Sequence, residues 1–337
     1  MEKVVPVAPA RRRSDLIRRL LRGWGAIVRR QELIVFVLLV MISAALGLGT
    51  ETFFTSTNLL NVAVYVSWFA IAAFGVGVAI IIGGIDLSIA AVMALAGLVC
   101  ASTLRQGAPL PVAILLGLGS GTLVGLLNGV LVSSFRLPPF IVTLGAMGVA
   151  RGITLALTNG VPVRDLPESF RVLGQGALPL GPLAVPLPLL WMALLAALVS
   201  LMLHQTVLGR YIYMVGRDEP ALLAAGVPTG RVKLLAYMLS GALAAFSGMI
   251  MTAKLGVAAP VAASGYELDI IAAAVIGGTS LFGGEGTVTG IILGALLMQI
   301  ARNGLVLLGL PSFLQWLTIG AMILLVILLD FGRRRQV

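Results

Sequence analysis

Long apolar runs, interrupted by few charged residues, are the feature that most constrains the fold of this chain. Charged residues make up 11% of the sequence and hydrophobic residues 59%, and the mean hydropathy is +1.08. A soluble globular domain has about 25% charged residues, so the chain does not belong to that class. A backbone inside lipid must satisfy its own hydrogen-bonding groups, which favours helices over loops. The sequence therefore predicts an all-α polytopic membrane protein.

The apolar runs predict about ten membrane-spanning helices. They lie at residues 33–49, 60–82, 87–104, 110–134, 139–158, 185–204, 232–253, 267–280, 286–308 and 312–330. A spanning helix needs roughly 20 apolar residues, so 267–280 is short and 87–104 is marginal. Each of these two segments is consistent with a broken or re-entrant helix, which is tolerated where protein covers it or where it lines a cavity.

Basic residues are distributed unevenly about these spans and predict their orientation. With the N-terminus inside the cell, 17 Lys and Arg residues lie on the inner side and four on the outer side. Basic residues beside membrane spans stay cytoplasmic, so both termini are expected in the cytoplasm. Three regions follow: a basic amphipathic segment at 1–32, a membrane domain at 33–330 and a basic tail at 331–337. Anionic lipid attracts such segments, whereas no aromatic or fold signal accompanies them that would indicate nucleic-acid binding.

The stretch 209–231, GRYIYMVGRDEPALLAAGVPTGR, stands apart because it is polar and lies between two apolar runs. Pro220 suits the first turn of a helix, and Gly226 followed by Pro228 suits its end. The pattern predicts a short helix and turn on the cytoplasmic side of the membrane. A solvated loop and a docking element for a cytoplasmic partner both agree with it.

Four consecutive spans contain an approximate repeat. IDLSIAAV at 85–92 resembles LDIIAAAV at 268–275, and TLGAM at 143–147 resembles TIGAM at 318–322. Spans two to five would thus match spans seven to ten. A shift by five spans inverts the topology, which is an arrangement found in many transport proteins.

Ionisable and polar groups inside these helices are the candidates for function. A charge within a membrane helix costs about 2.5–3.5 kcal/mol on insertion scales, so the positions of Asp86, Asp269 and Glu285 require a reason. Asp86 follows two glycines, and both it and Asp269 are consistent with a helix cap or with a lining of a solute pathway. The candidates for pathway or cap are Asp86, Ser88, Asn128, Asp269 and Asn303.

Other chemical signals are missing from the sequence. It has no GxxxxGK[ST] phosphate-binding loop, and no nucleophile, base and orienting residue stand together. The single cysteine, Cys100, and the single histidine, His204, do not form a metal-ligand pattern. We therefore expect a protein that is not an enzyme and that binds neither a metal nor a cofactor of its own.

Four ordered blocks carry a resemblance to a known family. They are GGIDLSIAAVMALAG, NGVLVSSFRLPPFIVTLGAMGVARGITLALTNG, LGRYIYMVGRDEPALLAAGV and GYELDIIAAAVIGGTSLFGGEGTVTGIILGALL. Together they resemble the permeases of bacterial ABC importers for monosaccharides, of the ribose permease type, from about residue 33 to 330. The resemblance implies an inner-membrane permease that works with a periplasmic sugar-binding protein, a second permease chain of the same or a different kind, and a cytoplasmic ATPase that binds the ATP.

The resemblance also implies a role for the polar stretch 209–231. It corresponds to the cytoplasmic loop that touches the ATPase in this family. The expected contact residues are Arg210, Gly216, Arg217, Glu219, Ala224 and Gly226. The alternative function is an ion-coupled secondary transporter of a small polar solute, in which Asp86 and Asp269 would bind the coupling ion.

Overall fold

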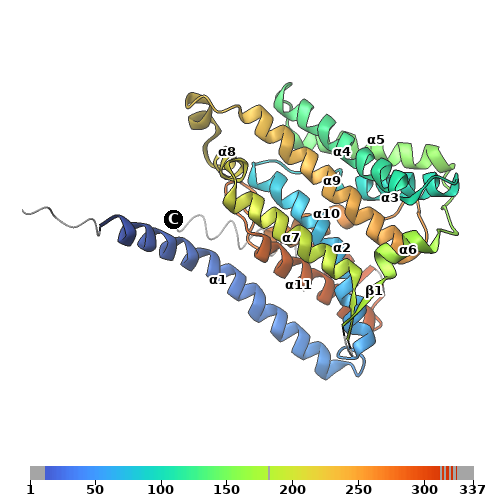
Figure 1. The fold of residues 1–337 in the computed structure, drawn as a ribbon. Coiled ribbons are helices and arrows are strands. Elements are labelled where there is room, and N and C mark those ends of the chain that lie inside the picture. The colour runs from blue at the N-terminus through green and yellow to red at the C-terminus, as the bar shows by residue number, and fades with distance from the viewer. Residues whose placement is uncertain are drawn as a thin grey trace, which may run out of the picture.

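The structure, a computed structural model, describes residues 12–180, 183–311, 313, 314, 316–318, 320, 321 and 324. Within these residues the chain is almost entirely helical (Figure 1). The helices are α1 (Arg12–Gly49), α2 (Ser56–Ile81), α3 (Ile89–Arg105), α4 (Leu110–Ser133), α5 (Pro139–Thr158), α6 (Glu168–Gln175), α7 (Leu187–Gln205), α8 (Val207–Ala224), α9 (Thr229–Leu255), α10 (Tyr266–Ile276) and α11 (Val288–Leu307). A short antiparallel hairpin, β1 (Ala177–Leu180) and β2 (Leu183–Pro186), is the one departure from the predicted all-α class among the described residues.

Seven helices in the described part of the chain are long and apolar enough to cross a membrane. They are the 31–49 portion of α1 together with α2, α4, α5, α7, α9 and α11. This confirms a polytopic membrane protein, while the count of ten spans and the inverted repeat stay predictions. The tenth predicted span, 312–330, lies largely outside the described residues, as do the first 11 residues and the tail 331–337.

The two segments predicted to be short are short helices. Helix α10 has 11 residues and α3 has 17. At 1.5 Å per residue α10 extends about 16 Å, roughly half of a bilayer's hydrocarbon core. Glycines bound it on both sides: Gly265 adopts a φ of +87° before its first residue, and Gly278 a φ of +102° after its last.

Helix α2 forms the centre of the bundle. In its apolar stretch 94% of the residues are buried, and α7, α9, α10 and α11 pack around it. Helix α9 lies between α2 on one side and α3 and α4 on the other (Figure 1). Glycines permit this close packing, because a Cβ added to Gly125 would lie 2.3 Å from the backbone oxygen of Tyr237 on α9.

Helix α1 is a single continuous helix of 38 residues. Its C-terminal part packs against α11, and its N-terminal part extends away from the bundle (Figure 1). The predicted division near residue 32 therefore falls inside a continuous helix. The amphipathic character of the N-terminal part stays a prediction.

Candidate functional site

A polar cluster lies where the chain leaves α2 and enters α3. Asp86 is 1% exposed in this break. Its Oδ1 accepts hydrogen bonds from the Ser88 backbone N–H at 3.0 Å and from the Ser88 hydroxyl at 2.5 Å. Its Oδ2 accepts one from the Ser240 hydroxyl on α9 at 2.7 Å. Asn128 on α4 donates to Ser88 Oγ at 3.0 Å. This Asp86 cluster therefore fixes the break to α4 and α9.

Asp86 is not the N-cap residue of α3, as the cap alternative required. Helix α3 begins at Ile89 with Ser88 as its N-cap, and Ser88 makes no side-chain capping bond. Asp86 lies two residues earlier and folds back on Ser88, because Gly83, with a φ of +81°, has already turned the chain out of α2. The Oδ1 atom of Asn128 has no hydrogen-bond partner among the described residues. A pathway role for these side chains stays a prediction.

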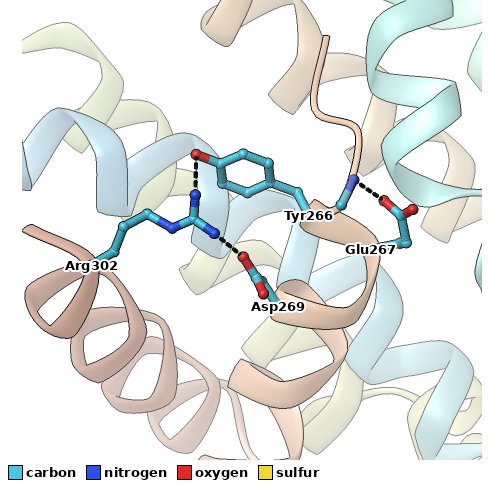
Figure 2. Close-up of polar contacts among 5 residues, drawn as sticks. Tyr266, Glu267, Asp269 and Arg302 are labelled. Carbon is cyan, nitrogen blue, oxygen red and sulfur yellow. Dashed lines mark hydrogen bonds and ion pairs between the residues drawn. The ribbon is translucent and has the colours of Figure 1, made fainter. Parts of the chain in front are cut away.

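Asp269 belongs to a second cluster at the start of α10 (Figure 2). Arg302 on α11 donates to Asp269 Oδ2 in an ion pair. The other guanidinium nitrogen of Arg302 donates to the Tyr266 hydroxyl at 3.2 Å, and its Cζ lies 4.5 Å from the Tyr266 ring centroid. Trp68 on α2 packs against the same ring with centroids 5.5 Å apart. This Asp269 cluster joins α2, α10 and α11.

The cap alternative is wrong for Asp269 as well. Helix α10 begins at Tyr266, so Asp269 lies inside the helix and Gly265 is the N-cap. The carboxylate of Glu267 instead accepts the Gly265 backbone N–H at 3.0 Å (Figure 2). The segments 85–92 and 268–275 therefore differ in backbone structure, although their sequences are similar. Asp86 lies between two helices and bonds hydroxyls, whereas Asp269 lies within a helix and pairs with a cation.

Two further polar groups are occupied by the protein itself. Asn303 on α11 exchanges two hydrogen bonds with Asn58 on α2, at 2.9 and 3.1 Å. Arg151 on α5 donates to the carbonyl oxygens of Pro260 and Ala262 at 2.8 and 3.0 Å, which holds the loop before α10. Both groups serve contacts between elements in this conformation.

The predicted helix at Pro220 is present as the second, shorter part of α8. Asp218 has non-helical angles, φ −156° and ψ 81°, and divides α8 into two helical pieces. Its Oδ1 accepts the Ala221 backbone N–H at 3.0 Å, which is the N-cap bond to the third helical residue. Gly226, with a φ of +77°, ends the second piece as expected. The first piece, from Val207, had not been predicted as helix.

The six candidate contact residues of this stretch do not share one environment. Ala224 and Gly226 are exposed, and nothing lies within 4 Å of a Cβ added to Gly226. Glu219 bonds Lys233 on α9 at 2.7 Å, and Gly216 packs against backbone inside the protein. Arg210 and Arg217 are exposed and border a cavity of about 500 Å³. Leu223, beside Ala224, is 54% exposed. Exposed side chains therefore occur on both helical pieces, and in the second piece they are those of Pro220, Ala221, Leu223 and Ala224.

The glycine-rich stretch 277–286 forms the turn between α10 and α11 and borders the same cavity. Glu285 lies in this turn, outside the helices, and its carboxylate is 3.8 Å from the Arg217 guanidinium. The side chains of this pair are 50% and 62% exposed, so the pair contributes little to stability. Glu285 is therefore an exposed residue of a turn and not part of a helix.

Sequence reasoning missed the partners of the candidate residues. Arg302 carried a usable signal, because a cation inside a predicted span requires an anionic or carbonyl partner. Ser240 carried none, since a serine is not unusual in a helix of this composition. Within the part of the chain that the structure describes, no group of three or more His, Cys, Asp or Glu is arranged to hold a metal ion.

Comparisons with known proteins identify the family. The family described as branched-chain amino acid transport system / permease component matches residues 58–327. The ribose import permease protein RbsC of Escherichia coli K12 is 39% identical, over 92% of this chain and 95% of its own length. The L-arabinose ABC transporter permease protein AraH of Azospirillum brasilense is 32% identical, over 98% of this chain and 93% of its own length. The D-allose transport system permease protein AlsC of E. coli K12 is 32% identical, over 88% of this chain and 90% of its own length. No solved structure matches the chain.

Proposed function

The chain belongs to the family of ABC-transporter permeases described as branched-chain amino acid transport system / permease component, and we propose that it imports a monosaccharide of the ribose class. It is a multi-pass permease of the bacterial inner membrane and forms the translocation pathway of an ABC importer. The observation that carries this function is similarity to sugar permeases along nearly the whole chain. The sugar is of the kind that these relatives move.

Energy comes from a separate ATPase subunit. The chain has no phosphate-binding loop of its own, which agrees with a subunit that contains no cofactor and leaves ATP to its partner. The segment 1–32, the stretch 209–231 and the tail 331–337 face the cytoplasm in this proposal. The asymmetry of 17 inner and four outer basic residues supports that orientation.

The second helical piece of α8 is the docking element for the ATPase. The Asp218 cap starts this piece as a helix, and the Glu219–Lys233 pair joins it to α9. Leu222 is 4% exposed and faces the permease, while Leu223 is 54% exposed. An apolar side chain held outward on a fixed helix suits a partner's groove.

The remaining partners are a periplasmic sugar-binding protein at the opposite face and a second permease chain, identical or different. The five polar candidates, Asp86, Ser88, Asn128, Asp269 and Asn303, border the pathway in this proposal. Hydrogen bonds within the α2–α3 break and between helices occupy them in the present conformation. They would meet the sugar only when those helices move.

Uptake measurements test this function directly. Proteoliposomes would contain the permease and its ATPase, with ATP enclosed and the sugar-binding protein outside. Radiolabelled ribose, L-arabinose and D-allose would be offered in turn. We expect uptake of at least one sugar that requires ATP and continues when an ionophore abolishes ion gradients. Uptake that needs an ion gradient and proceeds without ATP would instead establish the ion-coupled carrier.

A further inference from the structure

Three segments of the chain meet at one junction. They are the first helical piece of α8 at Gly216, the C-terminal end of α2 at Ile81, and the turn between α10 and α11 at Gly283 and Gly284. The Gly284 backbone N–H donates to the Ile81 carbonyl oxygen at 2.8 Å. A Cβ added to Gly216 would lie 1.9 Å from that oxygen and 2.4 Å from the Gly284 nitrogen. Only glycine at position 216 permits this approach.

A hydrogen bond reinforces the same junction. Tyr213, one helical turn before Gly216, donates from its hydroxyl to the Gly286 carbonyl oxygen at 2.7 Å. Burial raises the pKa of Tyr213 to about 12. The turn itself depends on left-handed backbone, with φ values of +86° at Gly283 and +75° at Gly284. The shape of the turn therefore depends on its own glycines, and its attachment to α8 depends on Tyr213 and Gly216.

The junction leads to both polar clusters. The turn continues into α10, which carries Asp269, and into α11, which carries Arg302. The end of α2 continues into the break that carries Asp86. A displacement of α8 would thus be applied to the two places where the helices of the bundle are interrupted.

We propose that Tyr213 and Gly216 are positioning residues that transmit the movement of α8 to the α10–α11 turn and to the end of α2. This rests on the proposed function, in which the ATPase moves α8. The ATPase contacts the second helical piece, whereas Tyr213 and Gly216 belong to the first piece. Docking and transmission are therefore carried by different residues and can be separated by substitution.

The experiment uses the complete transporter in proteoliposomes, with whichever of ribose, L-arabinose or D-allose the wild type takes up. Three quantities are measured: ATPase recovered with the permease, ATP hydrolysed in the presence of sugar-loaded binding protein, and sugar transported per ATP. Tyr213→Phe should leave ATPase recovery unchanged. It should lower sugar transported per ATP by a factor of about two to ten, the effect that one hydrogen bond has on an equilibrium. Gly216→Ala should lower this ratio further, because the added methyl group separates α8 from the turn.

Matched controls come from neighbouring positions. Tyr211→Phe removes a hydroxyl from the same helical piece, and Gly230→Ala adds a methyl group whose nearest neighbour is 3.8 Å away. Both should retain the wild-type ratio. Tyr213→Phe with a wild-type ratio would overturn the proposal. So would a loss of ATPase recovery in proportion to transport, because Tyr213 would then only support the fold of α8. Ala224→Glu could retain the ATPase while Tyr213→Phe lowers sugar transported per ATP. The ATPase would then dock elsewhere on the permease, and transmission through Tyr213 would stand.

Discussion

The pair formed by Arg302 and Asp269 gives a quantitative test of how α10 is held in the bundle. The Asp269 side chain is 5% exposed and the Arg302 side chain 27%. Removing Arg302 leaves a carboxylate enclosed by protein, whereas removing Asp269 leaves a guanidinium that still bonds Tyr266 and is less buried. The two single substitutions should therefore differ in their cost.

The magnitudes follow from this difference in burial. Breaking a buried pair by removing one partner costs about 3–5 kcal/mol, so Arg302→Met should lower the free energy of unfolding by that amount. Asp269→Leu should cost about 1–3 kcal/mol, since the more exposed guanidinium keeps a hydrogen bond and its contact with an aromatic ring. Replacing both residues by apolar ones is often close to neutral. The double variant Asp269→Leu/Arg302→Met should thus be more stable than Arg302→Met alone.

Unfolding in detergent, followed by the loss of folded permease on heating or in denaturant, measures these differences. Arg105→Met is the control, because Arg105 is exposed at the end of α3 and its loss should cost less than about 0.5 kcal/mol. Additive costs in the double variant would refute the reasoning, because they would show that the two side chains do not stabilise each other.

Two further predictions concern the α2–α3 break and the orientation of the chain. Asp86→Asn should be mild, at about 1 kcal/mol, because an amide oxygen still accepts from Ser88, whereas Asp86→Leu should cost several times more by leaving three buried donors unpaired. Equal losses of folded protein on heating for both variants would mean that the carboxylate charge itself is required. Gly226→Cys, in a Cys100→Ala background, should react with impermeant thiol reagents only from the cytoplasmic side, since position 226 is exposed. Labelling from the periplasmic side would reverse the predicted topology.

Much of the helical structure could be predicted from local sequence. Each of the first nine predicted spans overlaps a helix, and the boundaries are closest where proline marks a start. The span predicted at 139–158 coincides with α5, which follows Pro138. Proline fixes φ and disfavours helix in the preceding residue, so such boundaries are encoded locally. The two ends of the second helical piece of α8 were also predictable, because Pro220 suits a helix start and Gly226 a left-handed helix end.

The connections between helices could not be predicted in the same way. Tyr213 and Gly286 are 73 positions apart, and Asp269 and Arg302 are 33 apart. Such partners are brought together by packing, on which hydropathy carries no information. The resemblance of IDLS to LDII even suggested equivalent caps, whereas the glycines before Asp86 and the Glu267 contact at Gly265 produce two different backbones. The similarity in sequence around Asp86 and Asp269 is therefore not matched by a similar local backbone.

Recovery of the ATPase by variants of the docking helix tests the central claim most directly. Ala224→Glu places a charge on an exposed position and should leave the permease folded, as should Gly226→Val, which disturbs only the left-handed end of the helix. A charge buried in an interface without a partner costs several kcal/mol. In detergent pull-down normalised to recovered permease, both variants should lose the ATPase and, in proteoliposomes, sugar uptake. Wild-type recovery and uptake by both variants would contradict docking through α8.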